Sequence, residues 1–182
     1  MEVLEAIRGR RSIRRYKADP VGDKALEVVL EAARWAPSWA NTQCWRFIVV
    51  RDDSTKNKLA DTLNETNPAR DAIRTAPVVI VVGAELGRAG FKEGKATTDK
   101  GDWFMFDVAL AMQNLVLVAH SLGLGTVYVG RFDAKGVARI LRVPLGGCVV
   151  AMTPFGYPDE AKEPRPRKEL SEIVFTEKWG AP

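Results

Sequence analysis

The stretch DWFMFDVALAMQNLVLVAHSLGLGTVYVG, from Asp102 to Gly130, decides the fold. Asp102 can cap a helix in which apolar residues occur on nearly every face, and such a helix needs cover on all sides, from its own sheet and from a second subunit. Four polar residues interrupt the helical part: Asp107, Gln113, Asn114 and His120. Because they break the continuous apolar run of a membrane span, we expect a buried helix. Gly123 and Gly125 end it, and residues 126–129 predict a strand.

The rest of the chain alternates between helical and strand patterns. Apolar spacing and caps predict helices over residues 3–9, from Asp23 to just before Pro37, over 54–63, and from Asp133 to Leu141. Strands are predicted over residues 47–50, 77–83 and 148–153. The second of these, PVVIVVG, is the continuous β-branched run typical of a central strand buried on both faces. Residues 85–101 contain four glycines and no clear period, which predicts a mobile loop or lid.

The composition sets outer limits on the function. With 182 residues and 46% hydrophobic content, the chain predicts one domain over residues 1–182. Cys44 and Cys148 lack C-x-x-C spacing and a histidine cluster, so we expect buried thiols and no metal site. No apolar leader follows Met1, which predicts a cytoplasmic protein. A net charge of +4 keeps nucleic acid open as a rival partner.

Two arginine-rich motifs at opposite ends of the chain indicate an anion site. RRSIRRY, over residues 10–16, places four arginines around Ser12, and PRPR, over residues 164–167, adds two more. Guanidinium groups suit phosphate because two parallel N–H donors match two oxygens, and a hydroxyl adds a further directed bond. The motifs together predict a pocket for a terminal phosphate. The alternatives are a solvated basic turn and a basic docking tail.

The order of the motifs identifies a family. RRSIRRY, then PSWANTQCWRF over residues 37–47, then the long helix ending in LGLGT with YVG, then GYP and the late PRPRK, resembles the FMN-dependent nitroreductase family over nearly the whole chain. The resemblance implies an α+β fold: a three-layer α/β/α arrangement with a mostly antiparallel sheet and a long central helix. It also implies a homodimer with FMN at the subunit interface. Residues 158–182 would then form a domain-swapped C-terminal arm over the partner subunit.

The resemblance also assigns the cofactor site residue by residue. The flavin tail would lie against Arg10, Arg11, Ser12 and Arg14, with Arg165 and Arg167 closing on the phosphate, and Arg15 would be ordinary surface. The flavin ring would be lined by Pro37, Ser38 and Trp39 of the partner subunit, by Asn41, and by Val127, Val129 and Gly130, whose backbone would face the central ring. The sequence departs from the usual family pattern at Cys44, where proline is common, and at Val129, where many larger members have glutamate.

The expected activity follows from the cofactor. The resemblance implies that FMN passes hydride from NAD(P)H to a nitroaromatic, quinone or similar electron-poor acceptor by a ping-pong mechanism. No Ser/His/Asp triad or carboxylate pair is evident in the sequence, and a flavin enzyme tolerates this because the cofactor carries the redox chemistry. Trp103 and Phe104 are candidates for stacking on a flat substrate. Three alternatives stay open: reductive dehalogenation or flavin fragmentation on the same fold, a flavin-binding regulator, and a basic nucleic-acid-binding domain.

Overall fold

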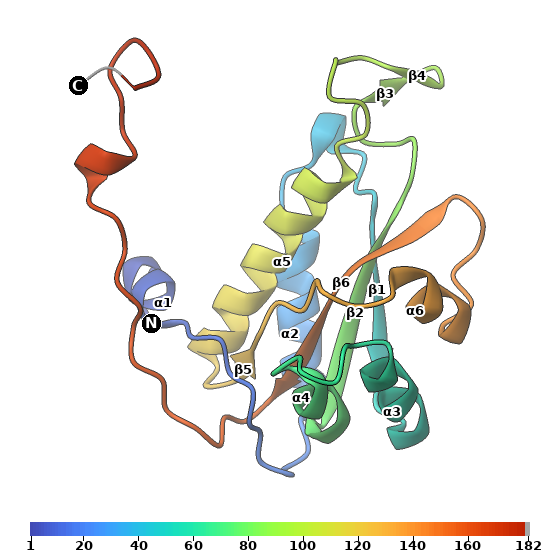
Figure 1. Ribbon diagram of the computed structural model, residues 1–182, viewed down its shortest axis with the longest axis vertical. Coiled ribbons are helices and arrows are strands. Elements are labelled where there is room, and N and C mark those ends of the chain that lie inside the picture. The colour runs from blue at the N-terminus through green and yellow to red at the C-terminus, as the bar shows by residue number, and fades with distance from the viewer. Residues whose placement is uncertain (181–182) are drawn as a thin grey trace.

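The computed structural model describes residues 1–180, and Figure 1 shows their arrangement. The helices are α1 (Val3–Gly9), α2 (Asp23–Arg34), α3 (Asp53–Asp61), α4 (Arg70–Thr75), α5 (Phe104–Ser121) and α6 (Ala134–Ile140), with short 3-10 turns η1 (Trp39–Asn41) and η2 (Leu170–Glu172). The strands are β1 (Trp45–Val50), β2 (Val78–Glu85), β3 (Phe91–Lys92), β4 (Lys95–Ala96), β5 (Gly125–Thr126) and β6 (Gly147–Gly156).

The main sheet has the order β1-β2-β6-β5, and each neighbouring pair of these strands is antiparallel. β2 lies inside the sheet, as its β-branched run predicted, and its side chains alternate between two cores. Val78, Ile80, Val82 and Ala84 face one buried cluster, whereas Val79 and Val81 face the other.

Helices cover both faces of this sheet. α2 and α5 pack against each other and fill the core on one face, and α3, α4 and α6 supply the core on the other (Figure 1). The predicted α+β fold with three layers is therefore confirmed. This packing holds α5 in place against α2 and the sheet. The candidate site residues lie near the two ends of this helix.

The long helix α5 is covered on one side only within a single chain. Its buried stripe consists of Asp107, Val108, Ala111, Met112, Leu115, Val116 and Ala119. On the opposite side Met105 and Phe106 are more than half exposed. By length and hydropathy alone α5 could cross a membrane, but its buried stripe packs on α2 and the sheet. The expectation of cover on all sides is thus met on one side, and an apolar face remains for another surface.

The structure adds local detail that the sequence did not predict. Within residues 85–101, whose mobility stays a prediction, β3 and β4 form a hairpin whose base packs on Trp103; at Gly90, which has φ +81°, a Cβ would come within 2.6 Å of the Trp103 ring. The strand after α5 is shorter than predicted, because β5 stops at Thr126 and only an isolated bridge at Val129 resumes the pairing. Helix α4 was not predicted, since six residues are too few to show a helical period.

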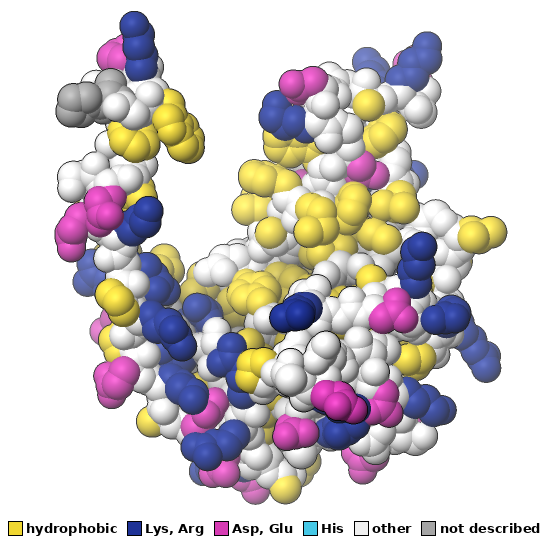
Figure 2. All heavy atoms as spheres, in the orientation of Figure 1, with side chains coloured by type: hydrophobic (Ala, Val, Ile, Leu, Met, Phe, Trp, Pro, Cys, Tyr) yellow, Lys and Arg dark blue, Asp and Glu magenta, His cyan; other side chains and the backbone are white. Residues whose placement is uncertain are grey.

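The C-terminal segment extends away from the body. Residues 161–180 are exposed, and they include the large apolar side chains Leu170, Ile173, Val174, Phe175 and Trp179. Figure 2 shows this segment standing apart from the domain, with hydrophobic side chains on both sides of the open space between them. Exposed apolar residues in such numbers indicate an interaction surface.

Candidate functional site

The two arginine motifs meet because the root of the C-terminal segment runs beside the N-terminal motif. The backbone N–H of Lys17 donates to the Tyr157 carbonyl and that of Asp159 to the Arg15 carbonyl, both at 2.9 Å. Glu160 fixes the contact, since its carboxylate accepts from the Arg14 backbone N–H at 2.6 Å.

Glu160 is almost fully buried and remains ionised. Its carboxylate lies 2.9 Å from Lys162 Nζ and 3.6 Å from Arg15 Nε. Burial acts to raise the pKa of Glu160, but the hydrogen bonds from Lys162 and from the Arg14 backbone outweigh it and lower that pKa. A charged carboxylate therefore ties the segment to the motif across neutral and mildly acidic pH.

These contacts enclose a cavity of about 710 Å³, within the range of roughly 300–1,000 Å³ that is typical of ligand pockets. Seven cationic side chains and one carboxylate line it: Arg8, Arg10, Arg11, Arg14, Lys162, Arg165, Arg167 and Glu163. Figure 2 shows Lys and Arg gathered at the root of the C-terminal segment. Ser12 also lines this cavity, so the predicted hydroxyl and arginines are brought together.

Two of the arginines that line this cavity each have a buried guanidinium nitrogen without a partner. Arg10 Nη1 and Arg14 Nε have no hydrogen-bond acceptor among the described residues. A buried, unpaired donor on a charged group is costly, and an anion in the cavity would remove that cost. The cavity therefore has the chemistry of a phosphate site.

The other arginines of the cavity differ in what they contact. Arg11 is committed to the backbone, since its Nη1 donates to the Arg8 and Arg10 carbonyls at 2.6 and 3.0 Å and its Nε to the Lys162 carbonyl at 3.2 Å. It therefore braces the wall of the cavity. Within residues 1–180, the Arg167 guanidinium donates only to neighbouring carbonyls in its own segment, those of Arg165 and Pro166.

The strand after α5 lies beside this cavity. Ser12 bridges to Thr126, and the Ile13 backbone N–H donates to the Thr126 carbonyl at 2.9 Å. Val127 and Val129 point into the core and can offer only backbone. The Val129 N–H is already bonded to the Met152 carbonyl at 2.9 Å. The backbone of Gly130 is exposed and open to close approach, since a Cβ there would meet no heavy atom within 4 Å.

Tyr128 is a member of this region that the sequence analysis did not select. Its hydroxyl donates to Gln113 Oε1 on the exposed side of α5 at 2.9 Å. Burial raises the pKa of Tyr128 to about 12, and the positive charge of Arg10 acts in the opposite direction. Tyr128 therefore stays protonated and links the strand after α5 to the exposed face of that helix.

The loop that contains Pro37, Ser38, Trp39 and Asn41 lies at the other end of α5. The Trp39 backbone N–H donates to both carboxylate oxygens of Asp107, in the first turn of α5, at 3.0 and 3.1 Å. The arginine cavity, in contrast, lies next to His120 in the last turn. Thirteen residues of helix at about 1.5 Å each separate these positions by about 20 Å. One chain therefore holds two halves of the predicted site at opposite ends of one helix.

Cys44 lies beneath this loop, and the reactivity of its thiol tests whether Cys44 is buried. It is fully buried, and its Sγ lies 3.7 Å from Asp107 Oδ2. Burial first, and then the negative charge of Asp107, raise the pKa of the Cys44 thiol from 9.0 to about 12. Cys148 is less buried.

We expect iodoacetamide at pH 8.5 to label Cys148 before Cys44, and to label Cys44 only after denaturation, because the thiolate is the reacting form. Between pH 9 and 12 the folded chain keeps the proton of the Cys44 thiol, whereas the unfolded chain loses it. The contribution of the protonated, buried thiol to the free energy of unfolding is therefore complete below pH 9 and is lost as the pH rises to 12. Mass spectrometry of the labelled peptides checks the first result. Rapid labelling of Cys44 in the native protein would contradict it.

Comparison with known proteins places this geometry in context. The sequence profile of the nitroreductase family matches residues 7–72 and 60–157. A putative NADH dehydrogenase/NAD(P)H nitroreductase of Methanothermobacter thermautotrophicus is 33% identical, over 98% of this chain and 88% of its own. The solved structure of an FMN-dependent nitroreductase from Clostridium difficile aligns with a TM-score of 0.79 at 27% identity, over 94% of this chain and 98% of its own. An iodotyrosine deiodinase of Rattus norvegicus is 28% identical, over 96% of this chain and 69% of its own.

Proposed function

The chain belongs to the nitroreductase family, and on this premise we propose that it is an FMN-dependent oxidoreductase that uses NAD(P)H to reduce an electron-poor acceptor. The observation that carries the proposal is a cationic cavity, two of whose lining arginines, Arg10 and Arg14, each have a buried nitrogen without a partner among the described residues. That cavity suits the FMN phosphate. When bound, FMN takes hydride from NAD(P)H and returns the electrons to the acceptor.

The chain's own residues would bind and orient this cofactor. Arg10, Ser12 and Arg14 would hold the phosphate, and Arg165 and Arg167 would close over it from the C-terminal segment. Arg11 would brace the cavity wall through its backbone contacts. The exposed backbone of Gly130 would approach the flavin ring, where an N–H dipole stabilises negative charge without a titratable group.

We further propose that two copies of the chain form each site. Two halves of the predicted site lie about 20 Å apart along α5, so the loop of residues 37–41 would line the flavin whose phosphate the other copy holds. The exposed apolar residues Met105 and Phe106 of α5 would supply the interface.

The C-terminal arm, predicted over residues 158–182, of which 181–182 lie outside the described residues, would complete this homodimer by lying over the partner beyond its root, where Asp159 and Glu160 contact the arginine motif of their own chain. β1 is an edge strand, and a cavity of about 550 Å³ beside it is lined in part by Leu26, Leu30 and Phe47. Exposed apolar residues of the arm, such as Val174 and Phe175, would pack against this edge of the partner.

The acceptor is proposed to be a flat aromatic or quinoid molecule. At the loop end of α5, the rings of Trp39 and Trp103 have centroids 5.1 Å apart, and Trp103 and Phe106 meet edge-on at 5.4 Å. The rings of Trp39 and Trp103 form an aromatic surface beside Ser38, where a planar acceptor would stack. Nitroaromatics and quinones are the main candidates, and the similarity to a deiodinase supports halogenated phenols as the second.

The visible absorption spectrum of the purified protein tests the proposal. We expect a flavin spectrum, present on isolation or after addition of FMN, that bleaches when NADPH or NADH is added without oxygen. A nitroaromatic, a quinone or a halogenated phenol should then restore the colour and so identify the acceptor. A protein that takes up no FMN would contradict the proposal and favour nucleic-acid binding, which predicts steeply salt-dependent affinity instead.

A further inference from the structure

We propose that Asp107 is a positioning residue for the flavin ring: its buried carboxylate holds the loop of residues 37–43 in the conformation that lines the site. The inference deepens the proposed function and rests on it. Asp107 touches neither of the arginine motifs, so its effect would be transmitted through the loop alone.

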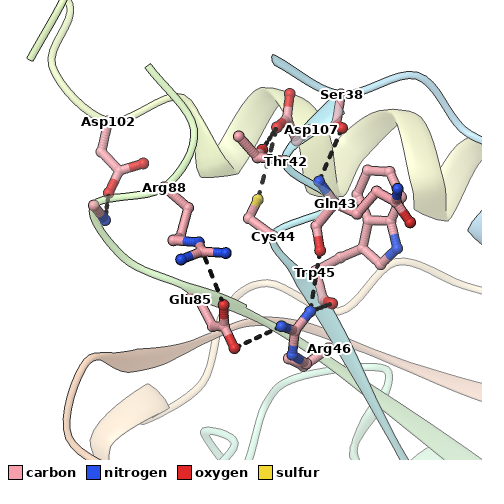
Figure 3. A network of polar contacts seen from close by, with 11 residues as sticks. Ser38, Thr42, Gln43, Cys44, Trp45, Arg46, Glu85, Arg88, Asp102 and Asp107 are labelled. Atoms are coloured by element: carbon pink, nitrogen blue, oxygen red, sulfur yellow. Dashed lines mark hydrogen bonds and ion pairs between the residues drawn. The ribbon is translucent and has the colours of Figure 1, made fainter. Parts of the chain in front are cut away.

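The carboxylate of Asp107 accepts from three positions of the loop and its exit. Figure 3 shows two of these donors, Thr42 and Cys44. Besides the Trp39 backbone N–H, which reaches both oxygens, Thr42 Oγ1 lies 3.5 Å and Cys44 Sγ 3.7 Å from Oδ2. The residue is only 1% exposed, although it lies in the most apolar helix of the chain. A buried carboxylate persists in such surroundings only when it is well paired, and here its partners come almost entirely from the loop.

The loop needs such an anchor because its backbone is strained. Ala40, Asn41 and Gln43 all have positive φ, at 43°, 55° and 48°, in the left-handed region that side chains disfavour. Internal bonds shape the turn: the Gln43 backbone N–H donates to Ser38 Oγ at 3.0 Å, and Gln43 Nε2 donates to Asn41 Oδ1 at 3.2 Å. Those bonds do not tie the turn to the rest of the fold. The Asp107 carboxylate does so, at the position of Trp39.

Cys44 supplies one of the donors to the Asp107 carboxylate. Its thiol points toward Asp107 and donates to the same oxygen that Thr42 contacts (Figure 3). Its own carbonyl accepts from the Glu85 backbone N–H at 2.9 Å. A proline at this position would offer the carboxylate no donor. The thiol therefore acts as a ligand of the carboxylate, and the raised pKa keeps it in the donating form.

The test compares the affinities of Asp107→Asn for FMN and riboflavin with those of the wild type. In this variant an NH₂ donor replaces one acceptor oxygen of the carboxylate and faces the donors of the loop, so the loop loses its anchor. We therefore expect both flavins to bind on the order of tenfold more weakly or worse. The factor should be the same for both, because the loop would line the flavin ring, which FMN and riboflavin share, and would not contact the phosphate. The absorption band of bound flavin should also shift, which a loss of stability alone would not cause.

Two further variants keep the test decisive. Asp52→Asn makes the same chemical change at the cap of α3, where the carboxylate accepts from the Thr55 N–H at 2.7 Å, and it should leave both affinities unchanged. Cys44→Ala keeps the carboxylate and serves as the second variant if Asp107→Asn does not fold. It should weaken the binding of both flavins by equal factors, smaller than those expected for Asp107→Asn. Wild-type affinity in both loop variants would overturn the positioning role. A wild-type protein that binds neither flavin would instead overturn the proposed function.

Discussion

Replacement of Arg10 by alanine is expected to weaken FMN binding by about 10- to 100-fold while riboflavin binding stays unchanged. A hydrogen bond to a charged group contributes about 1.5–3 kcal/mol, and every 1.4 kcal/mol is a factor of ten in affinity. Riboflavin has no phosphate, so it gains nothing from the guanidinium. Because Arg10 Nη1 is unpaired without an anion, its loss should leave the stability of the apoprotein nearly intact. Flavin-fluorescence titration with both ligands measures the effect.

Arg15→Ala is the matched control for this result. Arg15 belongs to the same RRSIRRY motif, but its side chain is 72% exposed and pairs with Glu160 at 3.6 Å, and it does not line the cavity. Its removal should leave FMN affinity within about twofold, since exposed ion pairs contribute little. Equal losses in Arg10→Ala and Arg15→Ala would show a diffuse electrostatic attraction in place of a phosphate site.

The contrast between these two arginines marks how far the sequence could predict the site. The fork chemistry of RRSIRRY and PRPR was enough to predict an anion pocket, and the structure brings the two motifs together. Which guanidinium groups are free depends on backbone carbonyls supplied by the fold, so the commitment of Arg11 to Lys162 could not be predicted. Glu160 was missed for the same reason, because its burial arises only when the C-terminal segment runs beside the motif.

Asp107 was visible in the sequence as a carboxylate in an apolar helix, but its partners were not. They lie more than sixty residues earlier in the chain, and their donors are presented by positive φ values that no local pattern encodes. Tyr128 escaped notice because a strand pattern does not reveal that its side chain reaches Gln113 across α5.

The fold was more predictable than the cover of its helices. Periodicity located α1 and α2, because a stripe of apolar residues is a property of the helix itself. Periodicity could not predict which surface, in the same chain or in another, covers the remaining apolar residues. Val3, Leu4 and Ile7 of α1 form the predicted stripe, yet all three are at least half exposed, and only Ala6 of that helix is buried. Such side chains carry information about a second surface.

Phe106→Asp is therefore expected to convert the proposed dimer into a monomer and to abolish FMN retention at the same time. Phe106 is 56% exposed on the open face of α5, so a carboxylate there does not disturb the core of one chain. In an interface it would bury a charge and remove an aromatic anchor, a change of several kcal/mol, about 10³-fold in association. FMN should be lost as well, because each site needs the arginine cavity of one copy and the loop of residues 37–41 from the other.

Leu145→Asp provides the control, since Leu145 is fully exposed in the turn before β6 and lies outside the proposed interface. Sedimentation velocity gives the oligomeric state, and absorbance in the visible range gives the bound flavin in the same experiment. The dimer proposal requires Phe106→Asp to lose both while Leu145→Asp keeps both. A monomeric Phe106→Asp protein that still holds FMN would show that one chain completes the site. The 20 Å separation along α5 argues against that outcome, because the loop of the same chain lies a helix length away from the phosphate.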